Sequence, residues 1–192
     1  RRPPRSTLFP YTTLFRSYPI SSMGTHVSAI PNHQVLRNVP LYTRANVAYF
    51  GTFGYELDIN QMTEQEHVQI QNQISFMKEH RELIQFGTFY RLKSPFEESV
   101  TAWMVVSKDK RQAIVGYYRV LQPVNTGYQR LKLQGLQEEW KYRVTGMKEG
   151  IYGDELMQAG LIVSDASSGE NKEKYNGDNG DYQSRLYMIE AD

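Results

Sequence analysis

The chain has 192 residues, of which 40% are hydrophobic and 22% are charged, a balance typical of a soluble protein with a packed core. Its 22 basic and 21 acidic side chains are interspersed and leave a formal net charge of +1, so neither nucleic acid nor a membrane surface is expected as a partner. Cysteine is absent, which excludes disulfides, thiolate nucleophiles and cysteine-based zinc sites. No apolar run reaches the length of a membrane span and no secretory signal is visible, so the expected location is the cytoplasm.

Residues 1–17 differ in composition from the rest of the chain. The stretch RRPPRSTLFPYTTLFRS has four arginines, three prolines and no acidic residue, and it lacks a helical or strand period. Its part TLFPYTTLFRS closely resembles the in-frame translation of a common sequencing-library adapter. We therefore predict that residues 1–17 are artefactual or disordered. The alternative, a basic targeting arm, is opposed by Pro3, Pro4 and Pro10, because proline breaks helices.

Residues 18–92 alternate strand and helix patterns, which predicts α/β organisation. Strands are expected at Met23–Ala29 and Phe53–Ile59, with a short helix at Thr43–Phe50 between them. The glycines of Gly51–Gly54 lack the spacing of a dinucleotide-binding motif, so this segment is predicted to be a turn.

A longer helix should follow the second strand. Thr63 and Glu66 have the spacing of a capping box, in which each side chain binds the backbone N–H of the other residue. Four apolar side chains then recur on one helical face and are expected to be buried: Ile70, Ile74, Met77 and Ile84.

After residue 93 the period of the pattern changes to two. Trp140, Tyr142 and Val144 alternate with polar residues, as in half-buried antiparallel strands. Further strands are expected at Arg130–Leu133, Ala102–Val106, Ala113–Leu121 and Arg185–Ile189. The polar run 166–181 predicts a long exposed loop. We therefore predict an all-β antiparallel sandwich over residues 93–192.

Three stretches together resemble the C-terminal part of bacterial family 36 α-galactosidases. The first is YPISSMGTHVSAIPNHQ with TRANVAYFGTFGYELDI, the second is QFGTFYRLKSPFE, and the third is YGDELMQAGL with the closing SRLYMIEA. The resemblance implies a (β/α)8 catalytic barrel followed by an antiparallel β-sandwich. Residues 18–92 would then be the end of the barrel, with Met23–Ala29 as its seventh strand and Phe53–Ile59 as its eighth.

The same resemblance implies a retaining glycoside hydrolase that releases terminal α-linked galactose from oligosaccharides of the melibiose and raffinose type. It implies no cofactor and leaves a homo-oligomeric parent open. Retaining hydrolysis needs two carboxylates about 5–5.5 Å apart. In the family both are aspartates in motifs resembling KWDMNR and SDxTD, and neither string occurs in these 192 residues. We therefore assign no catalytic residue and expect the fragment to be inactive alone. The alternative is a non-catalytic carbohydrate-binding or oligomerisation module.

Barrel enzymes bind substrate at the carboxyl ends of the strands. This rule makes His26, Ser28, Asn32 and His33 the substrate-proximal candidates, although a turn at Asn32 with local hydrogen bonds from the two histidines is the favoured explanation. The two histidines are seven positions apart without an adjacent carboxylate, so no metal site is assigned.

Other polar and aromatic residues have simpler explanations. Asp154 is interpreted as a helix N-cap rather than as an acid/base partner of Glu155, and Gly160 as the end of that helix. The carboxylates at positions 97 and 98 are interpreted as solvated loop charges. The aromatic residues of the strand patterns are expected in the core rather than stacked on sugars, namely Trp103, Trp140 and Tyr142.

Overall fold

The structure is a computed structural model that describes residues 18–32, 36–121, 129–163 and 181–192. The chain divides into two compact units, residues 1–85 and 86–192, and each unit is described by itself. The predictions for residues 1–17, for His33 and for most of the 166–181 loop lie outside the described residues. Among the described helices, none has the length and apolar character needed to cross a membrane.

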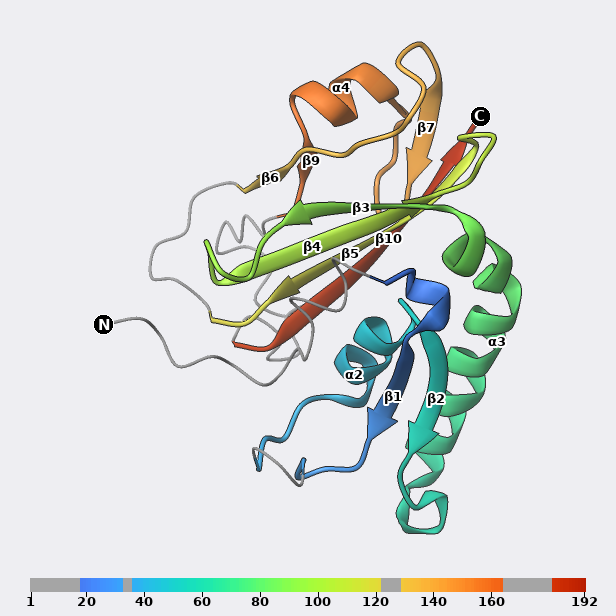
Figure 1. Ribbon diagram of the computed structural model, residues 1–192, viewed down its shortest axis with the longest axis vertical. Coiled ribbons are helices and arrows are strands. Elements are labelled where there is room, and N and C mark those ends of the chain that lie inside the picture. The colour runs from blue at the N-terminus through green and yellow to red at the C-terminus, as the bar shows by residue number, and fades with distance from the viewer. Residues whose placement is uncertain (1–17, 33–35, 122–128, 164–180) are drawn as a thin grey trace. The chain divides into compact units, whose positions relative to one another are not determined.

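The first unit is a strand–helix–strand arrangement followed by a long helix (Figure 1). Strands β1 (Gly24–Ser28) and β2 (Thr52–Glu56) are parallel and in register from Gly24↔Thr52 to Ser28↔Glu56. Helix α2 (Leu41–Ala48) connects the two strands, and α3 (Glu64–Phe86) follows β2. Short 3-10 turns lie at Ile20–Ser22 and Ile59–Gln61. This is the βαβ unit expected of parallel strands in an α/β barrel.

The predicted second strand has the wrong limits. β2 begins at Thr52, so Gly51–Gly54 is mostly strand rather than turn, and it ends at Glu56. It ends there because Asp58 starts a new local structure, in which its side chain accepts a hydrogen bond from the Asn60 N–H (3.0 Å). Only Gly51 lies outside the strand, and a Cβ there would be 2.9 Å from the backbone oxygen of Met23.

One face of the β1–β2 pair packs against helices. Val27 is fully buried, and the Thr25 hydroxyl donates to the backbone oxygen of Ala48 at the end of α2 (2.6 Å). The Phe53 ring stacks on Tyr49 with centroids 5.1 Å apart. Because side chains alternate along a strand, the intervening residues point to the opposite face.

Helix α3 begins as predicted. The Thr63 N–H donates to Glu66 Oε2 (2.9 Å), and the Glu66 N–H donates to Thr63 Oγ1 (3.3 Å), which completes the capping box. The predicted apolar face is only partly correct, because Ile74 is 36% exposed. Gln73 is buried instead, since its Oε1 accepts a hydrogen bond from the Tyr55 hydroxyl (2.8 Å).

The described residues of the second unit form nine strands and helices, with bounds as follows: β3 (Thr88–Lys93), β4 (Val100–Val106), β5 (Gln112–Arg119), β6 (Arg130–Leu131), β7 (Lys141–Val144), β8 (Ile151–Tyr152), α4 (Gly153–Gln158), β9 (Leu161–Ile162) and β10 (Gln183–Ala191). Six strands form one antiparallel sheet in the order β3-β4-β5-β10-β7-β8, and β6 pairs with β9 in a separate ladder. In Figure 1 the C-terminal strand β10 runs between β5 and β7.

The six-stranded sheet is covered on one face by the segment that carries β6, α4 and β9. Its core joins alternate residues of β4 and β5, such as Met104 and Val115, with Leu131, Leu156 and Leu161. The strand expected at Ala102–Val106 is present as β4, and all seven of its residues are buried. Among the described residues the second layer is a two-stranded ladder and a helix, so a sandwich of two full sheets stays a prediction.

The sequence placed the boundary between the two parts at residues 92/93, whereas the compact units divide at 85/86. The strand β3 accounts for the difference. It hydrogen-bonds to β4, with Thr88 opposite Val106 and Tyr90 opposite Met104, and therefore belongs to the antiparallel sheet.

Candidate functional site

The candidate site lies where β1 and β2 end, at the edge that carries substrate in barrel enzymes. The face of this pair that points away from α2 and α3 is formed by small and polar residues: Gly24, His26, Ser28, Thr52, Gly54 and Glu56. None of these six is buried in the part of the chain that the structure describes. Parallel sheets are normally covered on both faces, so a polar, partly glycine-built face suits a cavity rather than a packed layer.

His26 lies near the centre of this face. It is exposed and directly opposite Gly54, where an added Cβ would be only 3.1 Å from His26 Cδ2. The glycine therefore provides the space that the imidazole occupies. At the carboxyl end of the same face Ser28 is opposite Glu56, an exposed carboxylate that the sequence analysis did not single out.

Ser28 and Asn32 come close together after β1. Asn32 Nδ2 lies 3.5 Å from Ser28 Oγ, and the Asn32 N–H donates to the backbone oxygen of Arg37 (3.0 Å). The structure thus brings two of the four candidate residues together at the strand end. His26 is two residues earlier on the same strand, and His33 lies outside the described residues.

Arg44 is a further residue at this edge, and it was not predicted from the sequence. It lies in the first turn of α2, where its Nε donates to the backbone oxygen of Val39 (3.0 Å) and its Nη1 donates to the backbone oxygen of Ser28. Burial lowers the pKa of the guanidinium, and the nearby Glu66 carboxylate opposes this shift. The group stays protonated. A cation in the first turn of a helix opposes the helix dipole, and that signal could have drawn attention to it.

The carboxylates at positions 154 and 155 do not form an acid/base pair. Both are exposed on the first turn of α4, and Asp154 Oδ1 accepts a hydrogen bond from the adjacent Glu155 N–H (2.7 Å). The N-cap prediction was wrong by two residues, because α4 begins at Gly153 and Tyr152 is its N-cap. Gly160 ends the segment as predicted, with φ +88° and its N–H donating to the backbone oxygen of Glu155 (3.0 Å).

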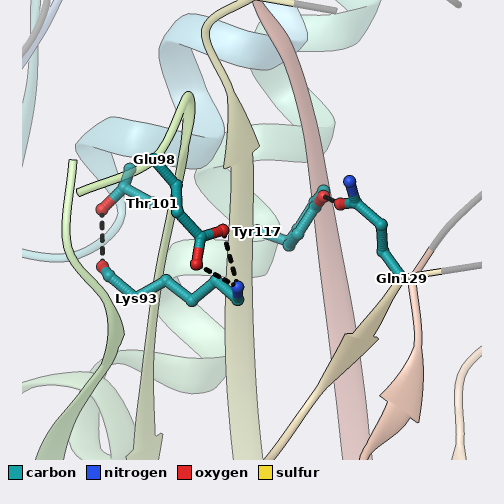
Figure 2. Close-up of polar contacts among 5 residues, drawn as sticks. All are labelled: Lys93, Glu98, Thr101, Tyr117 and Gln129. Carbon is teal, nitrogen blue, oxygen red and sulfur yellow. Dashed lines mark hydrogen bonds and ion pairs between the residues drawn. The ribbon is translucent and has the colours of Figure 1, made fainter. Parts of the chain in front are cut away.

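Glu97 and Glu98 are exposed in the loop between β3 and β4, as predicted, and Glu98 also forms an ion pair with Lys93. Lys93 Nζ donates to both carboxylate oxygens of Glu98, at 2.7 and 2.8 Å (Figure 2). The Thr101 hydroxyl donates to the backbone oxygen of Lys93 (3.1 Å), which joins β3 and β4 next to the loop that connects them. Nearby the Tyr117 hydroxyl donates to Gln129 Oε1 (2.8 Å), and burial raises the pKa of this tyrosine. These contacts stabilise the β-sheet unit. Glu98 is the one carboxylate among them, so they do not form an acid/base pair of the kind that glycoside hydrolysis needs.

The aromatic residues of the strand patterns are largely in the core, as predicted. Trp103 is 5% exposed and Tyr142 is fully buried. Trp140 is half-buried, with the Arg111 guanidinium 5.0 Å from its ring centroid. Among the described residues no group of three or more histidine, aspartate or glutamate side chains could hold a metal ion.

Two family models match the chain in succession. Residues 5–87 match the model described as melibiase, and residues 100–189 match the glycosyl hydrolase family 36 C-terminal domain. The first match includes part of the 1–17 segment, whose origin stays a prediction.

Among curated proteins, the chain is 52% identical over 152 residues to α-galactosidase AgaA of Geobacillus stearothermophilus, which covers 79% of this chain and 21% of that protein. It is 39% identical over 155 residues to the bifunctional α-galactosidase/sucrose kinase AgaSK of Mediterraneibacter gnavus, which covers 81% of this chain and 16% of that protein. The chain therefore spans about a fifth of the length of these relatives.

Solved structures of α-galactosidases are also similar to this chain. A crystal structure of a Geobacillus stearothermophilus AgaA variant with raffinose has a TM-score of 0.81 and 45% identity, covering 91% of this chain and 23% of that chain. The α-galactosidase from Lactobacillus brevis has a TM-score of 0.81 and 42% identity, again over 91% of this chain and 23% of the other.

Proposed function

We propose that this chain, which the two family matches and the relatives support as a fragment of a glycoside hydrolase family 36 protein, is the C-terminal part of an α-galactosidase. The whole enzyme would release terminal α-linked galactose from oligosaccharides such as raffinose. The observation that carries the proposal is the order of the two matches, melibiase and then family 36 C-terminal domain, across nearly the whole chain.

In this proposal the first unit supplies the last two strands and helices of the catalytic barrel. The parallel register of β1 and β2 and the helices on one face suit that place. The opposite face, with His26, Ser28 and Glu56, would line the lumen. A lumen built from glycine and polar side chains leaves room for water or a sugar, whereas large branched residues would fill it.

The bond-breaking carboxylates would come from barrel strands outside these 192 residues. Retaining hydrolysis needs one carboxylate to attack the anomeric carbon and another to protonate the leaving oxygen, about 5–5.5 Å apart. The family's two aspartate motifs do not occur in the printed sequence. We therefore expect the 192-residue polypeptide to have no hydrolase activity by itself, and its part in the whole enzyme is to complete and shape the site.

A chimera tests the proposal. Residues 18–192 replace the corresponding C-terminal segment of the Geobacillus AgaA relative, and hydrolysis of raffinose and of p-nitrophenyl α-galactoside is measured. The chimera should be active on both substrates, while the 192-residue polypeptide should be inactive. A second chimera, whose upstream nucleophilic aspartate is changed to asparagine, controls for contaminating hydrolase. A folded chimera without activity would refute the proposed function.

The 192-residue polypeptide by itself tests the alternative, a carbohydrate-binding module. If the 192-residue polypeptide alone bound raffinose saturably at millimolar concentration in a calorimetric titration, a binding role independent of the barrel would be favoured. Absence of binding, together with an active chimera, is the result that we expect.

A further inference from the structure

The connection between β1 and α2 is the feature that the proposed function leaves unexplained. Twelve residues separate Ser28 from Leu41, whereas strand–helix connections in α/β proteins usually have roughly 2–6 residues. A long connection at the carboxyl end of a barrel strand is a common place for substrate-binding groups.

This connection is tied at its base. The last sheet contact is the Ala29 N–H to the backbone oxygen of Glu56 (3.0 Å). Beyond it the Asn32 N–H donates to the backbone oxygen of Arg37 (3.0 Å), and the Leu36 N–H donates to that of Asn32 (2.7 Å). Leu36 has a positive φ of 52°, a conformation that a leucine adopts only when its surroundings impose it.

Arg44 holds the two ends of the connection together. Its guanidinium donates to the backbone oxygen of Ser28, where the chain leaves β1, and to that of Val39, just before α2 begins. The planar guanidinium holds its N–H donors in a fixed geometry, so one arginine can donate to both backbone oxygens at once. A lysine ammonium lacks that geometry. Desolvation lowers the pKa of Arg44, so burying this cation has a cost that these hydrogen bonds offset.

The residues near the Arg44 contacts carry groups of the kind that bind sugars. Ser28 and Asn32 offer a hydroxyl and an amide 3.5 Å apart. On the same connection Ile30 and Leu36 are apolar and exposed by 45% and 75%. Hydroxyl-binding groups beside exposed apolar side chains match the mixed surface of a pyranose or furanose ring. Ser28 is the last residue of β1 and Asn32 follows it on the connection, so both lie at the carboxyl end of the strand and would meet the outer part of a substrate rather than the galactose held deep in the barrel.

We infer that Arg44 is a positioning residue for the leaving-group sugar, acting through the β1–α2 connection whose ends it holds. The inference rests on the proposed function. In the whole enzyme Arg44 would touch neither the galactose nor the catalytic carboxylates. Its role is to keep Ser28 and Asn32 where the sugar next to the scissile bond can use them.

The test uses the active chimera with Arg44→Met and Arg44→Lys. The KM for raffinose should rise about tenfold in Arg44→Met, equivalent to the loss of about one hydrogen bond, with kcat changed less than about threefold. The inhibition constant of free galactose, which has no leaving-group sugar, should stay within about twofold. Arg44→Lys should recover only part of the loss, because it restores charge without the planar guanidinium. Arg81→Met, at an exposed position of α3, is the control for removing a positive charge.

The outcomes separate the inference from the proposed function. An inactive but folded wild-type chimera removes both. An active chimera in which Arg44→Met leaves the raffinose KM unchanged, or weakens raffinose and galactose equally, overturns the inference alone. If Arg44→Met fails to fold, as judged by its melting temperature, Arg44→Lys decides by the same two constants.

Discussion

Replacing Gly153 with alanine is expected to destabilise the second unit by about 3 kcal/mol. An added Cβ would lie 2.0 Å from the backbone oxygen of Gln137 and 3.2 Å from Tyr142 Cε2, so the start of α4 would have to move away. That movement strains two hydrogen bonds, from the Gly153 N–H to Trp140 (2.9 Å) and from the Asp154 N–H to Glu138 (3.1 Å). Overpacking costs about 1–3 kcal/mol and each hydrogen bond about 0.5–1.5 kcal/mol, while the better helix propensity of alanine returns about 1 kcal/mol.

Tryptophan fluorescence makes the measurement specific to this unit, since both tryptophans of the chain, Trp103 and Trp140, lie in it. Urea unfolding of residues 18–192 should show the full loss, and the melting temperature should fall by about 10 °C or more. Gly146→Ala is the matched control. Its φ is +83° and nothing lies within 4 Å of an added Cβ, so it should cost only about 1 kcal/mol of backbone strain. Equal unfolding midpoints for wild type and Gly153→Ala would refute the packing argument.

Three further predictions concern single polar groups. Tyr142→Phe should lower the free energy of unfolding by about 1–3 kcal/mol, measured by tryptophan fluorescence in urea. The Tyr142 hydroxyl accepts from the Gln137 N–H (2.9 Å) and donates to a backbone oxygen in the β4–β5 turn (3.0 Å), and an unchanged free energy would contradict the prediction. The Ser107 hydroxyl holds the pKa of Asp109 below its usual value of 3.8, so the ionised carboxylate stabilises the fold above that pH and the contribution is lost as pH falls below it. Asp109→Asn should therefore flatten the fall in stability between about pH 5 and pH 3, and parallel curves would exclude this. Thr63→Ala should destabilise α3 by about 1 kcal/mol, seen as faster amide exchange in its first turns, with Thr63→Ser as the control that retains the cap.

Features that depend on neighbouring residues could be predicted from the sequence. The capping box of α3 needs only Thr63 and Glu66, three positions apart, and its hydrogen bonds are those expected. The β7 pattern of alternating aromatic and charged residues likewise placed Tyr142 in the core. The order of the barrel and sheet segments came from the family resemblance, which spans both units.

Features that depend on distant partners were missed. Gln73 is buried because Tyr55, eighteen positions earlier, donates to it, and no local period shows this. β3 was missed because residues 88–93 mix apolar and charged side chains, and only pairing with β4 makes them a strand. At the candidate site Arg44 of α2 donates to the backbone oxygen of Ser28, sixteen positions earlier, and no local pattern predicts this contact.

The place of β3 at the edge of the sheet affects how the second unit should be produced in isolation. A polypeptide that starts at Lys93 would remove most of that strand and expose the backbone of β4, whose sequence VTAWMVV contains no charged side chain. An uncharged, apolar edge invites pairing with a second molecule, so such a truncation should aggregate. Starting at Phe86 retains β3, with Arg91 and Lys93 as the charged outer border that keeps single molecules apart.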